Sequence, residues 1–251
     1  MLAGLRRLLA TSDLLAFNLR NRDKWIAKQA AIVPAGSKVL DVGAGSAPYR
    51  ALFAHCHYKT QDFSQLQDDQ LRDGGYSPID FVSDARSIPV PDASFDAIVC
   101  TEVLEHVPEP IAVVREFGRI VRLGGRLILT APLGSGIHQE PYHFYGGYTP
   151  FWYERFLSEA GFEAIAIVPN EGTFRHIAQE TIRFARMSMP FRIKAPWYVS
   201  VAWLPFWLLL APILAMSVPV AAKFLDRFDT ERRHTVGYHV IAMRRDDGGH
   251  R

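Results

Sequence analysis

Cysteine is scarce in this chain, which has only two such residues among its 251. Cys56 and Cys100 are far apart and follow no paired spacing, so the sequence excludes a disulfide-stabilised secreted scaffold and indicates a reducing compartment. His55 and His57 flank Cys56, but adjacent residues in regular structure do not converge on one ion. No second pair of residues with ligand spacing follows, so we predict no metal site.

A large excess of charge of either sign is also missing, because 28 Lys and Arg residues stand against 26 Asp and Glu residues. The resulting net charge of +2 excludes bulk binding of nucleic acid. The length is sufficient for one large domain with a sizeable core. The sequence leaves the oligomeric state open.

We predict no secretory signal either, although residues 1–10 are basic and apolar. Asp13, Asn18 and Arg20 interrupt the apolar run, and no small-residue cleavage site follows it. We predict instead that residues 1–34 form a helical segment. Its first part has the composition of an amphipathic helix that lies on a membrane or protein surface.

The chain does contain a short buried-strand pattern that ends in two glycines one residue apart. Val39-Leu40 is apolar, Gly43 and Gly45 mark a tight turn, and a helix is expected after it from residue 49. Strand, glycine turn and helix are the first unit of a doubly wound α/β sheet, in which ligands bind at the carboxyl ends of strands. Pro48 replaces the third glycine of a dinucleotide fingerprint, and Asp41 favours a cationic ligand over a pyrophosphate.

The run from Val39 to Gly45 resembles the first motif of the S-adenosylmethionine-dependent methyltransferases of the Rossmann-like type. The similarity extends to Val107, and its most specific part is Phe95–Ile98 followed by Glu102–His106, which resembles the type-11 methyltransferase domain family. The resemblance implies S-adenosylmethionine as the cofactor and methyl transfer as the activity.

The family pattern also implies the residues that hold the cofactor. Asp62 ends the second strand about twenty residues beyond the glycine turn, where an acid bonds the ribose hydroxyls; its alternative role is to cap a loop. Asp84, at the end of a strand over 79–85, corresponds to the acid that bonds the adenine amino group. The implied cofactor site comprises Asp41, Gly43, Ala44, Gly45, Asp62, Asp84, Ala85, Thr101 and Glu102.

Strands and helices alternate up to Thr130, which predicts a parallel sheet with helices on both faces. The resemblance extends this to seven strands, the last of which runs antiparallel between strands five and six. We therefore expect a methyltransferase domain composed of residues 35–168 and 235–245.

Three histidines are candidates for the general base. The resemblance places His106 near the methionine end of the cofactor, although packing beneath a loop is an equal alternative. His138 and His143 lie in a long loop, 134–150, which resembles a segment of methyltransferases found among cell-envelope polysaccharide enzymes. His143 stands where an acid is more usual. A histidine near neutral pKa suits proton transfer, but the loop has an alternative role as a lid that excludes water.

Residues 169–234 form an insertion between the sixth and seventh strands. Its first part is a basic amphipathic helix, and residues 195–222 carry no charge. Prolines recur at 205, 212 and 219 and are expected to break the helix, so we predict a re-entrant or in-plane hairpin on a membrane. The alternative is a hairpin buried against a partner subunit.

The predicted activity is methylation of a small-molecule, lipid-linked or envelope glycan acceptor. The predicted location is cytoplasmic, with the protein peripheral or monotopic on the cytoplasmic face of a membrane. Two alternatives stay open: a nicotinamide-dependent oxidoreductase, which shares the fold, and a non-catalytic membrane-bound scaffold that binds the cofactor.

Overall fold

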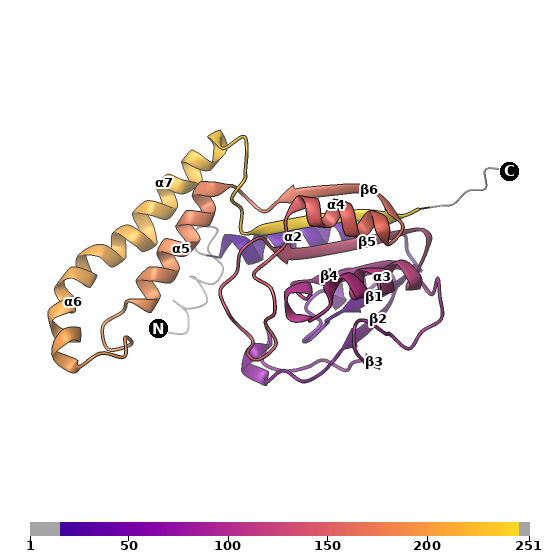
Figure 1. The fold of residues 1–251 in the computed structure, drawn as a ribbon, viewed down its shortest axis with the longest axis horizontal. Coiled ribbons are helices and arrows are strands. Elements are labelled where there is room, and N and C mark those ends of the chain that lie inside the picture. The colour runs from indigo at the N-terminus through magenta and orange to yellow at the C-terminus, as the bar shows by residue number, and fades with distance from the viewer. Residues whose placement is uncertain (1–15, 246–251) are drawn as a thin grey trace. The chain divides into compact units, whose positions relative to one another are not determined.

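The computed structural model describes residues 16–245, which divide into two compact units. Residues 22–168 and 237–245 form the first, here called the sheet unit, and residues 16–21 and 169–236 form the second, the hairpin unit. Figure 1 shows both. The amphipathic helix predicted near the N-terminus falls outside the described residues.

The sheet unit is built on seven strands in the order β3-β2-β1-β4-β5-β7-β6. Pairing is parallel from β3 to β5, and β7 runs antiparallel to β5. This confirms the predicted seven-stranded sheet with an antiparallel last strand. The strands are β1 (Lys38–Val42), β2 (His57–Asp62), β3 (Phe81–Val82), β4 (Phe95–Thr101), β5 (Val121–Pro132), β6 (Phe162–Pro169) and β7 (Gly237–Arg244).

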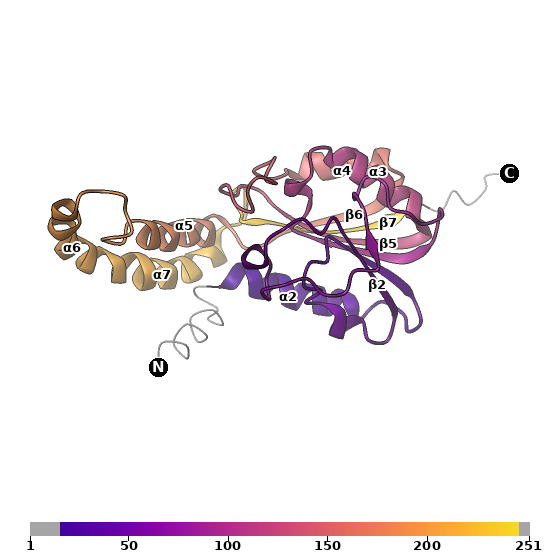
Figure 2. The ribbon, with the colours of Figure 1, turned by 90° about the horizontal axis from the view of Figure 1, so that it is seen from below.

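Helices cover both faces of this sheet. Figure 2 shows α3 (Pro110–Ile120) and α4 (Pro150–Glu159) on one face and α2 (Phe17–Ala30) on the other. Successive residues of a strand point to opposite faces, so Val39 packs with Ile26 of α2 whereas Leu40 belongs to the core that includes Phe117 of α3. Short 3-10 turns complete the unit: η1 (Arg50–Phe53), η2 (Asp68–Gln70) and η3 (Leu104–His106).

Two local elements are shorter than the sequence predicts. The segment after the glycine turn forms only the single 3-10 turn η1 instead of a helix. The strand expected over 79–85 pairs only at Phe81–Val82, because the Asp80 side chain occupies the preceding stretch of the sheet edge. Its carboxylate accepts hydrogen bonds from the backbone N–H of Thr60 at 3.0 Å and from the Thr60 hydroxyl at 3.1 Å.

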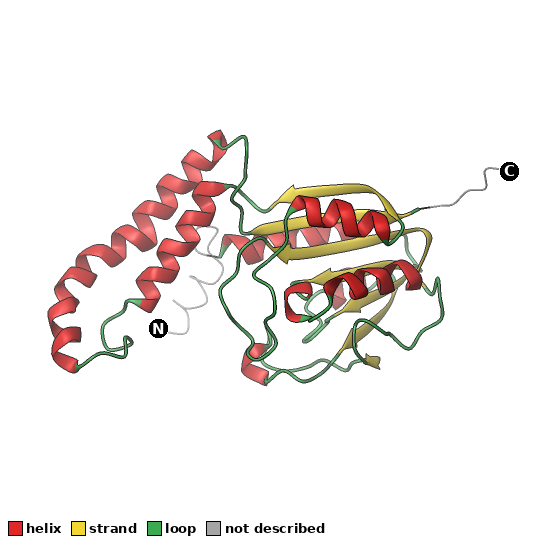
Figure 3. Ribbon diagram, viewed as in Figure 1, coloured by secondary structure: helices red, strands yellow, loops and turns green. Residues whose placement is uncertain are grey.

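The hairpin unit consists of two antiparallel helical arms. The first arm is α5 (Thr173–Met187), and the second joins α6 (Trp197–Pro212), a π-helical segment (Ile213–Ser217), α7 (Val218–Leu225) and the 3-10 turn η5 (Asp226–Phe228). Figure 3 shows the arms as red coils joined by a green loop. Indole N–H groups tie them together: Trp207 donates to the Ala185 carbonyl at 2.9 Å and Trp203 to the Ser188 carbonyl at 2.7 Å.

The predicted helix breaks at the three prolines are wrong, because the second arm is continuous from Trp197 to Phe228. A proline removes one N–H and crowds the carbonyl four residues before it, which usually kinks a helix. Here Pro219 lies in the first turn of α7, and the π-helical segment between Pro212 and Pro219 widens the turn where the ladder is interrupted. The bend of the hairpin therefore falls at 188–196, where the uncharged stretch begins.

Candidate active site

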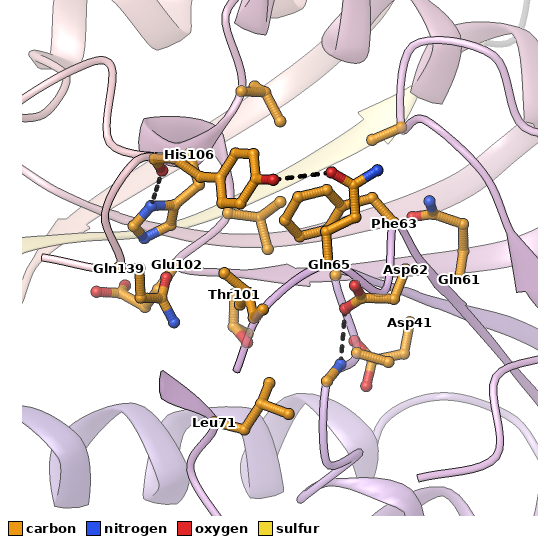
Figure 4. A pocket seen from close by; sticks show the side chains of 18 of the residues that line it. Asp41, Gln61, Asp62, Phe63, Gln65, Leu71, Thr101, Glu102, His106 and Gln139 are labelled. Carbon is orange, nitrogen blue, oxygen red and sulfur yellow. Dashed lines mark hydrogen bonds between the residues drawn. The ribbon is translucent and has the colours of Figure 1, made fainter. Parts of the chain in front are cut away.

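A cavity of about 730 Å³ lies in the sheet unit beside the carboxyl ends of the parallel strands. From β1 the chain moves outward to β2 and β3, and then returns to β4 on the other side of β1. The cavity is therefore at the point where the strand order reverses, which is the usual ligand site of doubly wound sheets. Figure 4 shows Asp41 and Asp62 on one side of it and Glu102 and His106 on the other.

The glycine turn forms one wall of the cavity. Gly43 and Gly45 have φ angles of +68° and +53°, in the left-handed region that favours glycine. A Cβ on Gly43 would stand 2.3 Å from a methyl carbon of Val103, so no side chain fits there. The N–H groups of Gly43 and Ala44 donate to the Gln61 carbonyl at 2.9 and 3.1 Å, which folds the turn onto the end of β2.

Asp62 fixes this turn from the neighbouring strand. Its carboxylate is buried and accepts hydrogen bonds from the N–H of Gly45 at 2.9 Å and from the N–H of Ser64 at 2.8 Å. The loop-capping role therefore exists in the structure. It leaves Asp62 on the cavity wall, where a second lone pair on each oxygen is available to a ligand.

Asp41 lies deeper, at the end of β1. Burial raises the pKa of its carboxyl to about 7, with a smaller contribution from the nearby Asp62 carboxylate, whereas a hydrogen bond from the Tyr58 hydroxyl acts in the opposite direction. A carboxyl poised in this range gains most from a cationic ligand, because the ligand charge favours the ionised form.

Asp84 and Ala85 lie on the wall formed after β3. Arg86 bonds the exposed Asp84 carboxylate through its Nε and Nη2 atoms at 3.0 and 2.8 Å, and this holds the pKa of Asp84 below its usual value. Ala85 is buried and, with Val82, supplies an apolar surface between polar groups. Such a surface suits a flat aromatic ring.

Thr101 and Glu102 form the wall after β4. Glu102 has a φ angle of +54°, and its carboxylate accepts a hydrogen bond from the Thr130 hydroxyl at 2.8 Å. Arg22 of α2 forms an ion pair with the other oxygen at 3.1 Å. Sequence reasoning missed Arg22, since nothing in the sequence of α2 indicates which of its basic residues reaches the sheet.

Gln61 is a second wall residue that the sequence did not reveal. Its Nε2 donates to the Ser83 carbonyl at 2.6 Å, and its buried Oε1 has no hydrogen-bond partner among residues 16–245. An orphaned acceptor on a cavity wall is expected where a ligand donor completes the bond. The only indication in the sequence was that Gln61 directly precedes Asp62, a predicted site residue.

The long loop after β5 closes over the cavity. The Tyr142 hydroxyl donates to Gln65 Oε1 at 2.9 Å, and the Tyr142 ring meets Phe63 edge to face at 5.0 Å. His106 lines the cavity, and its Nδ1 lies 2.6 Å from the Tyr142 carbonyl. Burial lowers the pKa of His106 to about 4, and neighbouring imidazoles also lower it, while the carbonyl contact opposes them. The ring is therefore neutral at pH 7.

The loop brings the three predicted histidines together. Ring centroids are 4.7 Å apart for His106 and His138, 4.7 Å for His138 and His143, and 5.6 Å for His106 and His143. Of the three, His106 lines the cavity, whereas His138 is exposed and His143 is half-buried beside it. The catalytic roles of all three stay predictions.

Residues 40–129 match the family model described as a methyltransferase domain. The chain contains a methyltransferase domain. This match confirms the predicted family, and S-adenosylmethionine is the cofactor of that family. The matched residues run from β1 into β5, so they include the glycine turn and all four acids of the predicted cofactor site.

Two similar curated proteins are named as methyltransferases. Demethylmenaquinone methyltransferase from Bacillus velezensis is 28% identical over 154 residues, which are 55% of this chain and 66% of that protein. Ubiquinone biosynthesis O-methyltransferase from Pseudomonas aeruginosa is 32% identical over 119 residues, 43% of this chain and 49% of that protein. The chain thus spans about half to two thirds of the length of these curated relatives.

A solved structure supports the fold of the methyltransferase domain. Phosphoethanolamine N-methyltransferase 2 from Haemonchus contortus, in complex with S-adenosyl-L-methionine, has a TM-score of 0.50 at 16% identity. The similarity covers 90% of this chain and 53% of that one. At this identity the likeness concerns the fold alone.

Proposed function

We propose that this chain transfers a methyl group from S-adenosylmethionine to a small, lipid-linked acceptor at a membrane surface. The observation that carries the proposal is the cavity at the reversal of the strand order, in which the Asp62 carboxylate and the Gly43–Gly45 turn are hydrogen-bonded into one wall. The family match supports the chemistry, and the exposed apolar hairpin supports the location.

The cavity fits the cofactor in its distribution of polar and apolar groups. The glycine turn lets a ligand approach the backbone closely. The acids Asp41 and Asp62 suit a cationic ligand rich in hydroxyl groups, and Gln61 offers an unpaired acceptor. Between them, Val82 and Ala85 provide an apolar wall for a ring. When bound, the cofactor supplies an electrophilic methyl carbon next to a sulfonium.

The chain's own task is then to align the acceptor and exclude water. The loop held by Tyr142 and Gln65 closes the site, and His106 presents a neutral imidazole to the cavity. A carbonyl can only accept, so its 2.6 Å contact places the proton on Nδ1 and leaves the Nε2 lone pair free. That lone pair can accept a hydrogen bond from an acceptor hydroxyl and take the proton as methylation makes it strongly acidic, which a base with a pKa of about 4 can do.

The proposed acceptor class rests on the hairpin unit. The helix Trp197–Phe228 is long and apolar enough, by length and composition only, to cross a membrane, and just 6% of its most apolar window is buried. The curated relatives named for menaquinone and ubiquinone also concern lipophilic molecules. A lipid-linked glycan fits the same location, as the resemblance of the 134–150 loop to envelope-polysaccharide enzymes suggests.

Calorimetry with S-adenosylhomocysteine tests the cofactor site. We expect micromolar binding by the intact chain and a roughly 10- to 100-fold loss in Asp62→Ala, because hydrogen bonds to a charged group contribute about 1.5–3 kcal/mol. The control is Asp92→Ala, which removes an equal charge from an exposed ion pair with Arg119. Equal binding by all three proteins would exclude this site, and dinucleotide binding instead would favour the oxidoreductase.

Vesicle flotation tests the location. The triple variant Phe206→Glu/Leu209→Glu/Met216→Glu places charges at side chains that are 60%, 71% and 64% exposed. We expect it to lose binding to anionic vesicles while S-adenosylhomocysteine binding stays unchanged. Retained flotation would overturn the membrane proposal alone. Labelled-methyl transfer to membrane extracts by the wild type, absent in Asp62→Ala, distinguishes an enzyme from a scaffold.

A further inference from the structure

Glu105 and two of the three histidines form a group of side chains that could share one ion. Glu105, His106 and His138 each offer a ligand atom, and the three atoms lie within 4.8 Å of one another. Glu105 and His106 belong to η3, whereas His138 arrives on the loop after β5. The tight turn, unlike a regular helix or strand, lets two successive side chains reach the same point: Glu105 Oε1 is 3.7 Å from His106 Nε2.

Both imidazoles are oriented as metal ligands are. Nδ1 of His106 lies 2.6 Å from the Tyr142 carbonyl, and Nδ1 of His138 lies 2.9 Å from the Gly136 carbonyl. A carbonyl oxygen only accepts, so each Nδ1 carries the proton and each Nε2 keeps a free lone pair. A backbone carbonyl behind the ring is the usual arrangement that fixes a metal-binding histidine.

The third member of the group, Glu105, is buried without a hydrogen bond to its carboxylate in the described part of the chain. The Glu105 side chain is only 1% exposed, and neither of its carboxylate oxygens has a hydrogen-bond partner among residues 16–245. Burial of an unpaired carboxyl group costs free energy unless a donor or a cation satisfies it. A bound cation beside His106 Nε2 would supply that partner.

We propose that Glu105, His106 Nε2 and His138 Nε2 bind a divalent transition-metal ion of the zinc class. Two imidazoles and one carboxylate form a zinc ligand set that leaves a fourth position open, whereas Mg²⁺ and Ca²⁺ prefer oxygen ligands. This differs from the sequence prediction of no metal, which considered neighbours in sequence and not a loop that returns from 33 residues away. His143 is outside the set because its Nε2 contacts the Ser135 hydroxyl at 3.0 Å.

The site adjoins the cavity through His106, so an ion there stands beside the proposed acceptor position. A bound ion would occupy the His106 Nε2 lone pair, so proton transfer to the free imidazole and activation by the ion are alternatives. If the proposed function holds, the open position is available to an acceptor oxygen, which the ion would polarise in place of the imidazole. The binding site itself does not depend on that function, since its residues and contacts are independent of the cofactor wall.

The test is a titration of the untagged, metal-free full chain with Zn²⁺, followed by competition with a chromophoric chelator, and a parallel titration with Co²⁺. We expect one equivalent to bind, with a visible Co²⁺ absorption band that reports nitrogen ligands. His138→Ala should weaken Zn²⁺ binding at least 10-fold and remove the band. The matched control His57→Ala, an exposed histidine of β2, should leave both unchanged.

Because His138 is exposed, its substitution leaves the core intact, and unchanged S-adenosylhomocysteine binding verifies folding. Glu105→Gln provides a second variant at the buried position, with the same expected loss of Zn²⁺ affinity. Equal Zn²⁺ affinity in the wild type and His138→Ala would overturn the site. So would a loss in His143→Ala as large as that in His138→Ala, since the ligand set would then be wrong. A failure here with intact cofactor binding leaves the proposed function standing.

Discussion

The two units use apolar side chains in opposite ways. In the sheet unit, Val113, Val114, Phe117 and Ile120 of α3 are all fully buried beneath the sheet. In the hairpin unit, the uncharged part of the second arm leaves large side chains exposed, among them Leu209 at 71% exposure. Contiguous exposed apolar surface of this kind marks a site for a membrane or another partner. Apolar composition alone therefore does not distinguish a core from a contact surface.

Buried acidic residues also lie in different kinds of position in the two units. The sheet unit buries Asp41 and Asp62 at a cavity, where burial raises the pKa of Asp41 and where Asp62 accepts a hydrogen bond from the glycine turn. The hairpin unit buries Asp226 at one end, where it caps a helix. Buried acids thus lie on the wall of a cavity in one unit and at the end of a helix in the other.

The largest expected difference between the two units appears when one apolar side chain is truncated in each of them. Phe117→Ala removes a fully buried ring from the core between α3 and the sheet, so we expect a loss of about 3–5 kcal/mol in the free energy of unfolding. Leu209→Ala removes a side chain that is 71% exposed, and we expect a change within about 0.5 kcal/mol. Urea unfolding of both variants gives the comparison.

Similar losses in the two variants would break the contrast between the units. In that case Leu209 would be covered by a second copy of the chain, which favours the buried-hairpin alternative over the membrane. Repeating the measurement over a range of protein concentrations distinguishes these possibilities, because stability supplied by association depends on concentration.

The second expected effect is the pH dependence that Asp41 gives to stability. Its pKa of about 7 lies above the model-peptide value of 3.8, so the folded state holds this proton more tightly than the unfolded state. The associated stability is full below the unfolded pKa and is lost as pH rises towards 7. At about 1.4 kcal/mol per pH unit, the loss between pH 5 and pH 7 is about 2–3 kcal/mol.

Asp41→Asn isolates this contribution, since the amide is nearly isosteric and its oxygen can still accept from the Tyr58 hydroxyl. We expect the wild type to lose stability relative to the variant from pH 5 to pH 7, with little further change above about pH 8. Chemical unfolding at four pH values measures it. Parallel curves for the two proteins would show that Asp41 is not the group responsible.

Sequence patterns were sufficient where local chemistry decides the structure. The turn at Gly43 and Gly45 has left-handed φ angles that glycine alone adopts readily, and the alternation of Val39 and Leu40 assigns their opposite faces. Asp62 ends β2 at the distance along the chain that the fold requires. These features follow from neighbours in sequence and from one common topology.

Sequence patterns did not predict contacts between segments that are far apart in the sequence. Arg22 reaches Glu102 from α2, and His138 meets Glu105 through the path of a loop, so no periodicity reveals either contact. The prediction that the prolines break the second arm failed for a related reason. Their helix-breaking tendency is local, whereas the π-helical segment and contacts with α5 accommodate them over several turns.

The smallest expected effect concerns the buried acid of the hairpin unit. The Asp226 carboxylate accepts hydrogen bonds from the N–H groups of Gly172 at 2.8 Å and Arg175 at 3.0 Å, which have no partner within the first turn of α5. Asp226→Ala should destabilise this end of the hairpin by about 1–2 kcal/mol, whereas Asp226→Asn keeps an acceptor and should lose less. Hydrogen exchange measures both: protection should fall at residues 172–176 and stay unchanged in β4 and β5. An equal fall in the strands would mean that the two units unfold together, because a cap confined to one independent unit cannot alter exchange in the other.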